Sequence, residues 1–68
     1  MKIRFWFVKE TELARQYCKF APHPDLGFAN AEESDLVWIP KSIVEHRSIR
    51  GLEHTLELPD WFIEEKGL

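Results

Sequence analysis

The residues of this chain with the most reactive side chains are one cysteine and three histidines: Cys18, His23, His46 and His54. A catalytic thiol needs a neighbouring base, and no feature of the sequence brings a histidine to Cys18. The simpler interpretation of Cys18 is a small buried hydrophobic residue. The chain has no Cys/His pair at metal-site spacing, so we expect no metal. His54 interrupts an otherwise apolar strand pattern and is expected to be a hydrogen-bonded core or rim residue.

Adjacent carboxylates are the other groups that could carry acid–base chemistry. Glu32-Glu33 and Glu64-Glu65 are such pairs, but neighbouring residues of a helix point apart, and both pairs are typical of a solvated surface. The sequence also has no glycine-rich phosphate loop and no nucleophile elbow. We therefore expect a binding protein without a cofactor rather than an enzyme.

Length and composition predict one small domain spanning residues 1–68. A chain of 68 residues cannot divide its buried surface between two cores. Hydrophobic residues make up 44% of the chain, and three Trp and five Phe are expected to supply much of the core. A core of this size gives only about 3 to 5 kcal/mol of net stability, so self-association into a homo-oligomer stays open.

The sequence also bears on the compartment. A single cysteine cannot form an internal disulfide, which favours a reducing environment. The aromatic run at the start is cut short by the polar residues 9–12, before it reaches the roughly 7 to 15 apolar residues of a signal peptide. Nothing approaches the roughly 20 apolar residues of a membrane span. We expect a cytoplasmic protein with no membrane contact.

Four segments suit β-strands: 2–8, 13–20, 36–39 and 52–58. In the first, Ile3, Phe5 and Phe7 share one face, while Lys2, Arg4 and Trp6 share the other. The last alternates just as clearly. Residues 13–20 fit a helix or a strand, and we take them as the second arm of a hairpin. Pro40 ends the third strand, although 42–44 could continue it past a kink, and the polar stretch 45–51 is expected to be a connection.

Two further features complete the predicted elements. Residues 21–35 contain Pro22, Pro24 and Gly27 and are expected to form a long loop, either pinned to the core by Leu26 and Phe28 or presenting Phe28 for binding. After Pro59, a helix of about two turns is expected, with Asp60 placed to cap its first amides and Gly67 to end it.

The C-terminal half resembles a group of small proteins from phages and other mobile elements. The likeness rests on Val37-Trp38-Ile39-Pro40-Lys41-Ser42-Ile43 and on Leu56-Glu57-Leu58-Pro59-Asp60-Trp61-Phe62, followed by a closing Gly67-Leu68. In that group a W-I-P-K-S strand precedes a final helix that starts after proline and ends in G-L. The resemblance implies an accessory protein in the cytoplasm of a host cell, and it carries no catalytic residues.

Two binding functions follow from the charges. The net charge of −3, from 12 acidic and 9 basic residues, argues against a protein held to nucleic acid mainly by charge but allows a local basic face. The favoured hypothesis is an acidic inhibitor that docks on a host nucleic-acid-binding defence protein, as anti-restriction and anti-CRISPR proteins do. Its candidate residues are Glu32, Glu33, Asp35, Phe28, Glu57, Asp60, Glu64 and Glu65. The alternative is that these carboxylates bind no partner and only keep the domain soluble.

The alternative function is a small nucleic-acid-binding barrel accessory to phage replication or recombination. Its cations would hold phosphates and its rings would stack on bases. The candidate residues are Arg4, Trp6, Lys41, Arg47 and Arg50, with Tyr17 as a second ring. The expected fold for either function is a mainly β (α+β) domain. It would have about four antiparallel strands, arranged as a small sheet or a partial SH3-like or OB-like barrel, and a short C-terminal helix.

Overall fold

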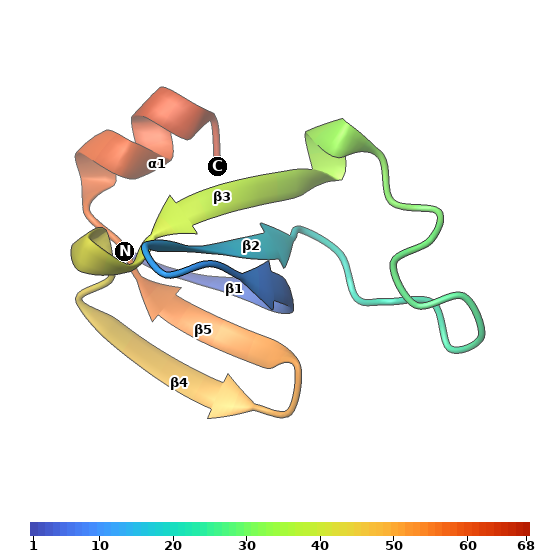
Figure 1. Ribbon diagram of the computed structural model, residues 1–68. Helices are drawn as coiled ribbons and strands as arrows, with labels where there is room; N and C mark the ends of the chain where they lie inside the picture. Colours follow the sequence, from blue (N-terminus) through green and yellow to red (C-terminus); the bar gives the residue numbers. More distant parts are fainter.

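The computed structural model describes all 68 residues and shows an antiparallel sheet followed by one short helix (Figure 1). The elements are β1 (Lys2–Glu10), β2 (Ala14–Cys18), β3 (Leu36–Pro40), β4 (His46–Arg50), β5 (Glu53–Glu57) and α1 (Asp60–Lys66). Two 3₁₀ turns, η1 (Glu33–Asp35) and η2 (Lys41–Ile43), flank β3. The predicted mainly β domain with a closing helix is confirmed, with five strands instead of about four.

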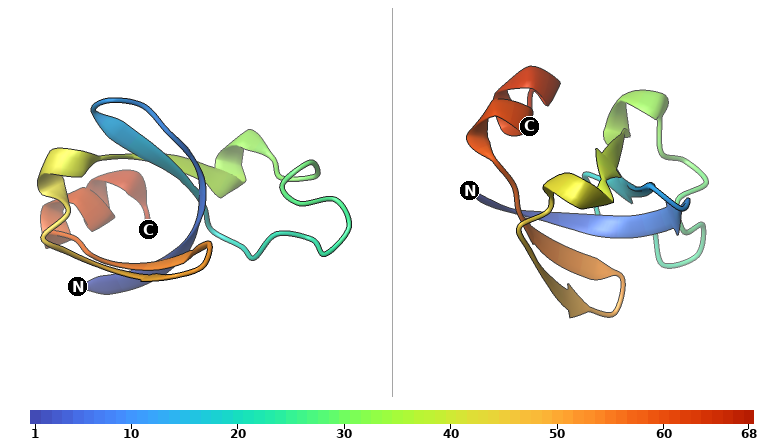
Figure 2. Two further views of the ribbon diagram at one scale, coloured as in Figure 1. Left: turned by 60° about the horizontal axis from the view of Figure 1, so that its bottom comes forward. Right: turned by 60° about the vertical axis from the view of Figure 1, so that its left-hand side comes forward.

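The strand order is β3-β2-β1-β5-β4, so β1 is central and β3 and β4 are edges. The sheet curls without closing, because its two edge strands do not pair with each other, and α1 lies over the curl (Figure 2). Segment 13–20 is a strand, as expected, since Ala14–Cys18 pairs with both β1 and β3. A hairpin therefore leads from β1 into β2.

The extra strand is β4, and the prediction that residues 45–51 form a connection is wrong. Its ladder with β5 pairs Arg47 with Leu56 and Ile49 with His54. Gly51, at φ +61°, supplies the left-handed residue of the tight turn between the two strands. The segment shows no apolar alternation because it is an edge strand whose residues are mostly exposed.

One face of the curled sheet holds the core together with α1. The core residues are Phe5, Tyr17, Val37, Ile39, Leu56, Leu58, Phe62 and Ile63. The expectation that tryptophans supply much of this core is wrong. Trp38 and Trp61 are 41% and 57% exposed, and Trp6 is only half-buried. The small interior is filled by medium-sized side chains, and the indoles lie outside it.

Helix α1 packs on the sheet through Phe62 and Ile63, which are 3% and 7% exposed. It ends as predicted at Gly67, whose φ of 69° is left-handed and whose N–H donates to the carbonyl of Glu64. The predicted capping by Asp60 is wrong. Pro59 occupies the N-cap position, Asp60 is the first helical residue, and no side chain caps the helix.

Candidate functional site

The side of the sheet opposite the core, which we call the outer sheet face, carries two tryptophans and four cations, of which only Arg4 is in an ion pair. Alternation along the strands assigns these residues to it: Lys2, Arg4, Trp6, Ala14, Gln16, Cys18, Leu36, Trp38, Pro40, His46, Ser48, Arg50, Glu53, Thr55 and Glu57. A register shift after Phe7 brings Lys9 opposite Gln16 and so adds Lys9 to this face.

Each tryptophan of the outer sheet face lies beneath a cation. The Arg4 guanidinium carbon is 5.9 Å from the Trp6 ring centroid, and Lys9 Nζ is 5.7 Å from that of Trp38. Trp6 is opposite Cys18 and Trp38 is opposite Gln16, so the rings flank β2 on strands β1 and β3. Their positions are about 10 Å apart across the sheet and about 7 Å along it. Both rings are therefore available on one surface, each with a positive charge beside it.

A hollow of about 320 Å³ lies on the β1–β5–β4 side of the face, and Arg4, which lies over the Trp6 ring, is part of its lining. Its lining includes two guanidinium groups, from Arg4 and Arg50, and two hydroxyl groups, from Ser48 and Thr55. Glu53 also lines it and pairs with Arg4 Nη1 at 3.0 Å. Guanidinium and hydroxyl groups are the side chains that most often hold phosphate oxygens. Arg50 takes part in no ion pair and stays free for an anionic group.

The residues expected for nucleic-acid binding separate into two groups. Arg4, Trp6 and Arg50 meet on the outer sheet face. Lys41 does not, since its Nζ pairs with Glu10 Oε2 at 2.7 Å, and this contact lowers the pKa of the Glu10 carboxyl. Arg47 is opposite Leu56 on the core side of β4, and Tyr17 is fully buried, so neither can stack on or bind a strand along the outer face.

The candidates chosen from the sequence did not include several residues of the outer face, among them Lys2, Lys9, Trp38, Ser48 and Thr55. Trp38 was correctly placed in a strand, and its alternation with Val37 and Ile39 was the available signal for its outward direction. Lys9 reaches the face only through the register shift, and Ser48 only because β4 is a strand. Neither of these follows from side-chain periodicity.

The acidic candidates also form two groups. Glu33 and Asp35 belong to η1 and Glu32 precedes it, and this turn lies at the opposite end of β3 from η2 and α1 (Figure 1). Asp35 accepts the Glu32 backbone N–H at 3.1 Å, so its carboxylate holds the turn. Glu57 and Asp60 lie near the N-terminal amino group, at 3.4 and 3.8 Å. Glu64 and Glu65 are exposed on α1 beside Trp61.

A buried polar pair lies on the core side of the sheet. Tyr17 Oη and His54 Nδ1 are 2.9 Å apart, and the Phe7 ring stacks on His54 with centroids 5.3 Å apart. Burial, together with the positive charges of Arg47 and Arg15, lowers the pKa of His54 below 6.5. Burial raises the pKa of Tyr17 above 10.0. The prediction of a hydrogen-bonded core histidine is confirmed, and the lowered pKa of His54 favours the uncharged imidazole in this pair.

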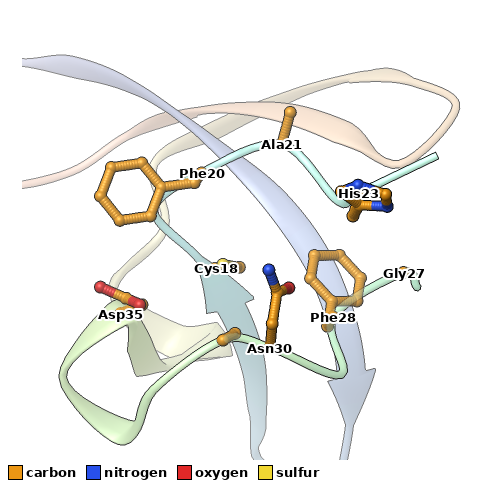
Figure 3. A pocket seen from close by; sticks show the side chains of 9 residues that line it. Cys18, Phe20, Ala21, His23, Gly27, Phe28, Asn30 and Asp35 are labelled. Carbon is orange, nitrogen blue, oxygen red and sulfur yellow. The ribbon is translucent and has the colours of Figure 1, made fainter. Parts of the chain in front are cut away.

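The loop after β2 encloses a second hollow, of about 240 Å³, against the end of that strand (Figure 3). Its lining is Cys18, Phe20, Ala21, His23, Gly27, Phe28, Asn30, Ala31 and Asp35. Cys18 is buried, as expected, and belongs to the outer side of β2, opposite Trp6. Phe28 is half-buried against the hollow, while Leu26 is 55% exposed and does not pin the loop.

The comparisons with known proteins give no family or relative. Neither a scan against protein-family models nor searches of curated proteins and solved structures match this chain. None of its helices has the length and apolar character needed to cross a bilayer. No three His, Cys, Asp or Glu side chains lie close enough together to hold a metal ion.

Proposed function

We propose that this chain is a non-enzymatic accessory protein whose outer sheet face binds single-stranded nucleic acid. The observation that carries the proposal is the pair of tryptophans on one open sheet face, each beneath a cation, together with a hollow on the same face that is lined by two arginines. Exposed rings stack on unpaired bases whatever the sequence, while cations follow the phosphates. The resemblance to phage and mobile-element proteins suggests replication or recombination as the setting.

The charge distribution supports this choice despite the net negative charge. On the outer sheet face, Lys2, Arg4, Lys9 and Arg50 outnumber the carboxylates, which come only from Glu53 and Glu57. Glu53 is paired with Arg4 and Glu57 with the N-terminal amino group. The acidic surplus of the chain lies elsewhere, on α1 and around η1. A strand on the outer face would therefore meet a locally positive surface.

The test is a fluorescence anisotropy titration with labelled single strands of about 12 nucleotides. Trp38→Ala should weaken binding about tenfold or more, because stacking of one base contributes about 1 to 3 kcal/mol. Trp61→Ala is the matched control, since that indole is also exposed, at 57% against 41% for Trp38, but lies on α1. Equal affinity of the wild type and Trp38→Ala would remove the outer sheet face as the binding surface.

A second candidate function is the docking of an acidic surface on a basic protein. The observation that favours it is Trp61, 57% exposed on α1 and flanked at helical spacing by Glu64 and Glu65. An exposed indole with a carboxylate rim is suited to a basic groove, such as the nucleic-acid channel of a defence nuclease. In that case the chain would inhibit DNA binding by such a nuclease, and Trp61→Ala, not Trp38→Ala, would abolish the inhibition.

A further inference from the structure

We infer that the hollow behind Cys18 holds one unpaired base of the strand that crosses the outer sheet face. This inference rests on the function proposed above and extends the binding site from Trp6 on β1 to the loop that follows β2. Cys18 lines the hollow and is opposite Trp6 in the β1–β2 ladder, one strand spacing of about 5 Å away. A strand stacked on Trp6 is therefore next to a residue of the lining.

The walls of the hollow are suited to the flat apolar faces of a base. Phe20 is 61% exposed and Phe28 is half-buried, and both line the space. In the view of Figure 3 their rings lie on opposite sides of the Asn30 side chain, which points into the space between Cys18 and Phe28. A phenyl ring held this way stacks on any base, because every base has a π-face. The exposed Phe20 ring is otherwise unexplained by packing.

The polar atoms of the hollow are suited to the edge of a base. Asn30 is exposed, and its amide, a donor and an acceptor together, takes part in none of the side-chain hydrogen bonds of the protein. His23 Nδ1 accepts the backbone N–H groups of Asp25 and Leu26, at 3.1 and 3.3 Å. This leaves its Nε2–H as a donor.

The loop is built to hold these groups in place. Backbone hydrogen bonds of 2.9 Å run in both directions between His23 and Gly27, and the Ala31 N–H donates to the Phe28 carbonyl at 3.0 Å. Gly27, at φ +61°, allows the tight turn that returns the chain to the hollow. The hollow is therefore largely formed before a ligand arrives, as small-ligand sites usually are.

The test measures anisotropy with a series of labelled strands, each carrying one abasic site at a different position. For the wild type, base removal should weaken binding by about tenfold at the positions that stack on Trp6 and Trp38 and at one further position, whose base occupies the hollow. Phe28→Ala and Asn30→Ala should bind the intact strand more weakly and should lose the effect of base removal at that further position only. Asn30→Ala changes an exposed side chain and guards against misfolding of the Phe28 variant. Leu26→Ala, in the same loop but outside the lining, is the matched control.

The other outcomes overturn the inference in distinguishable ways. Unchanged binding by Phe28→Ala and Asn30→Ala, with Trp38→Ala still weak, would show that the outer face binds a strand without using the hollow. If Phe28→Ala and Asn30→Ala lowered the affinity for intact and abasic strands equally at every position, the effect would come from the loop and not from contact with a base. Failure of the wild type to bind any strand would remove the proposed function, and the base site with it.

Discussion

At the scale of single residues, the buried His54 side chain is hydrogen-bonded to Tyr17 and favours its neutral form. His54 interrupts the apolar face of β5, and its ring is 6% exposed. The Tyr17 hydroxyl at 2.9 Å satisfies Nδ1, and Phe7 covers the ring face. A charged imidazole would be desolvated here and would face Arg15 and Arg47, which is why the folded state favours the neutral form.

This arrangement predicts a loss of stability in mild acid. Because the folded pKa of His54 is below 6.5, the unfolded chain takes up a proton first as the pH falls. The contribution of the neutral His54 to the free energy of unfolding is complete above about pH 6.5. Below that pH it decreases by at most about 1.4 kcal/mol per pH unit. Urea unfolding of the wild type and of His54→Gln between pH 5 and 8 measures it. The free energy of unfolding should depend less steeply on pH in the variant. Equal slopes for the two proteins would contradict the assignment of the acid sensitivity to His54.

At the scale of elements, helix α1 is stable only through its contact with the sheet. Seven residues are too few for an isolated helix, so Phe62 and Ile63 must supply the stability by burial. The neighbouring Trp61 contacts Phe62 edge to face, with ring centroids 5.8 Å apart, but remains largely in solvent. Trp61 and Phe62 are therefore expected to contribute very differently to the stability of the folded domain.

The expected result is a large difference between two alanine substitutions in this helix. Phe62→Ala should cost about 3 to 5 kcal/mol, which is comparable to the whole stability of a domain of this size. Trp61→Ala should cost about 1 kcal/mol or less. Urea unfolding followed by circular dichroism compares them. If Trp61→Ala were as destabilising as Phe62→Ala, the helix would pack in another orientation.

The elements that the sequence predicts well are those with a buried face. Alternation located β1 and β5, and the Pro59 and Gly67 boundaries located α1. Strand β4 was not predictable in this way, because an edge strand exposed on most of its residues carries no apolar period. The outer sheet face could be predicted only in part for the same reason. Its position depends on the β4–β5 ladder and on a register shift in β1, which are long-range pairings.

At the scale of the whole molecule, the charges are separated so that the net value of −3 hides a positive surface. The acidic residues of α1 belong to the helix that covers the core side of the sheet, away from the cations of the outer sheet face, whereas Asp35 of η1 lines the hollow beside Cys18. The composition shows the surplus of acidic residues and therefore favoured the hypothesis of an acidic surface that docks on a basic protein. Only the pairing of the strands showed that Arg4, Arg50 and Lys9 share a face with two indoles.

The most direct test of a nucleic-acid-binding outer face is the salt dependence of single-strand affinity, measured by anisotropy with the wild type and Arg50→Ala. With about three cations engaged, affinity should fall about tenfold or more between about 50 and 200 mM salt, and Arg50→Ala should reduce the logarithmic slope by about 0.7. Lys66→Ala, on α1, should leave the slope unchanged. Absence of binding at low salt, or a slope that Arg50→Ala does not alter, would contradict the assignment of the outer sheet face.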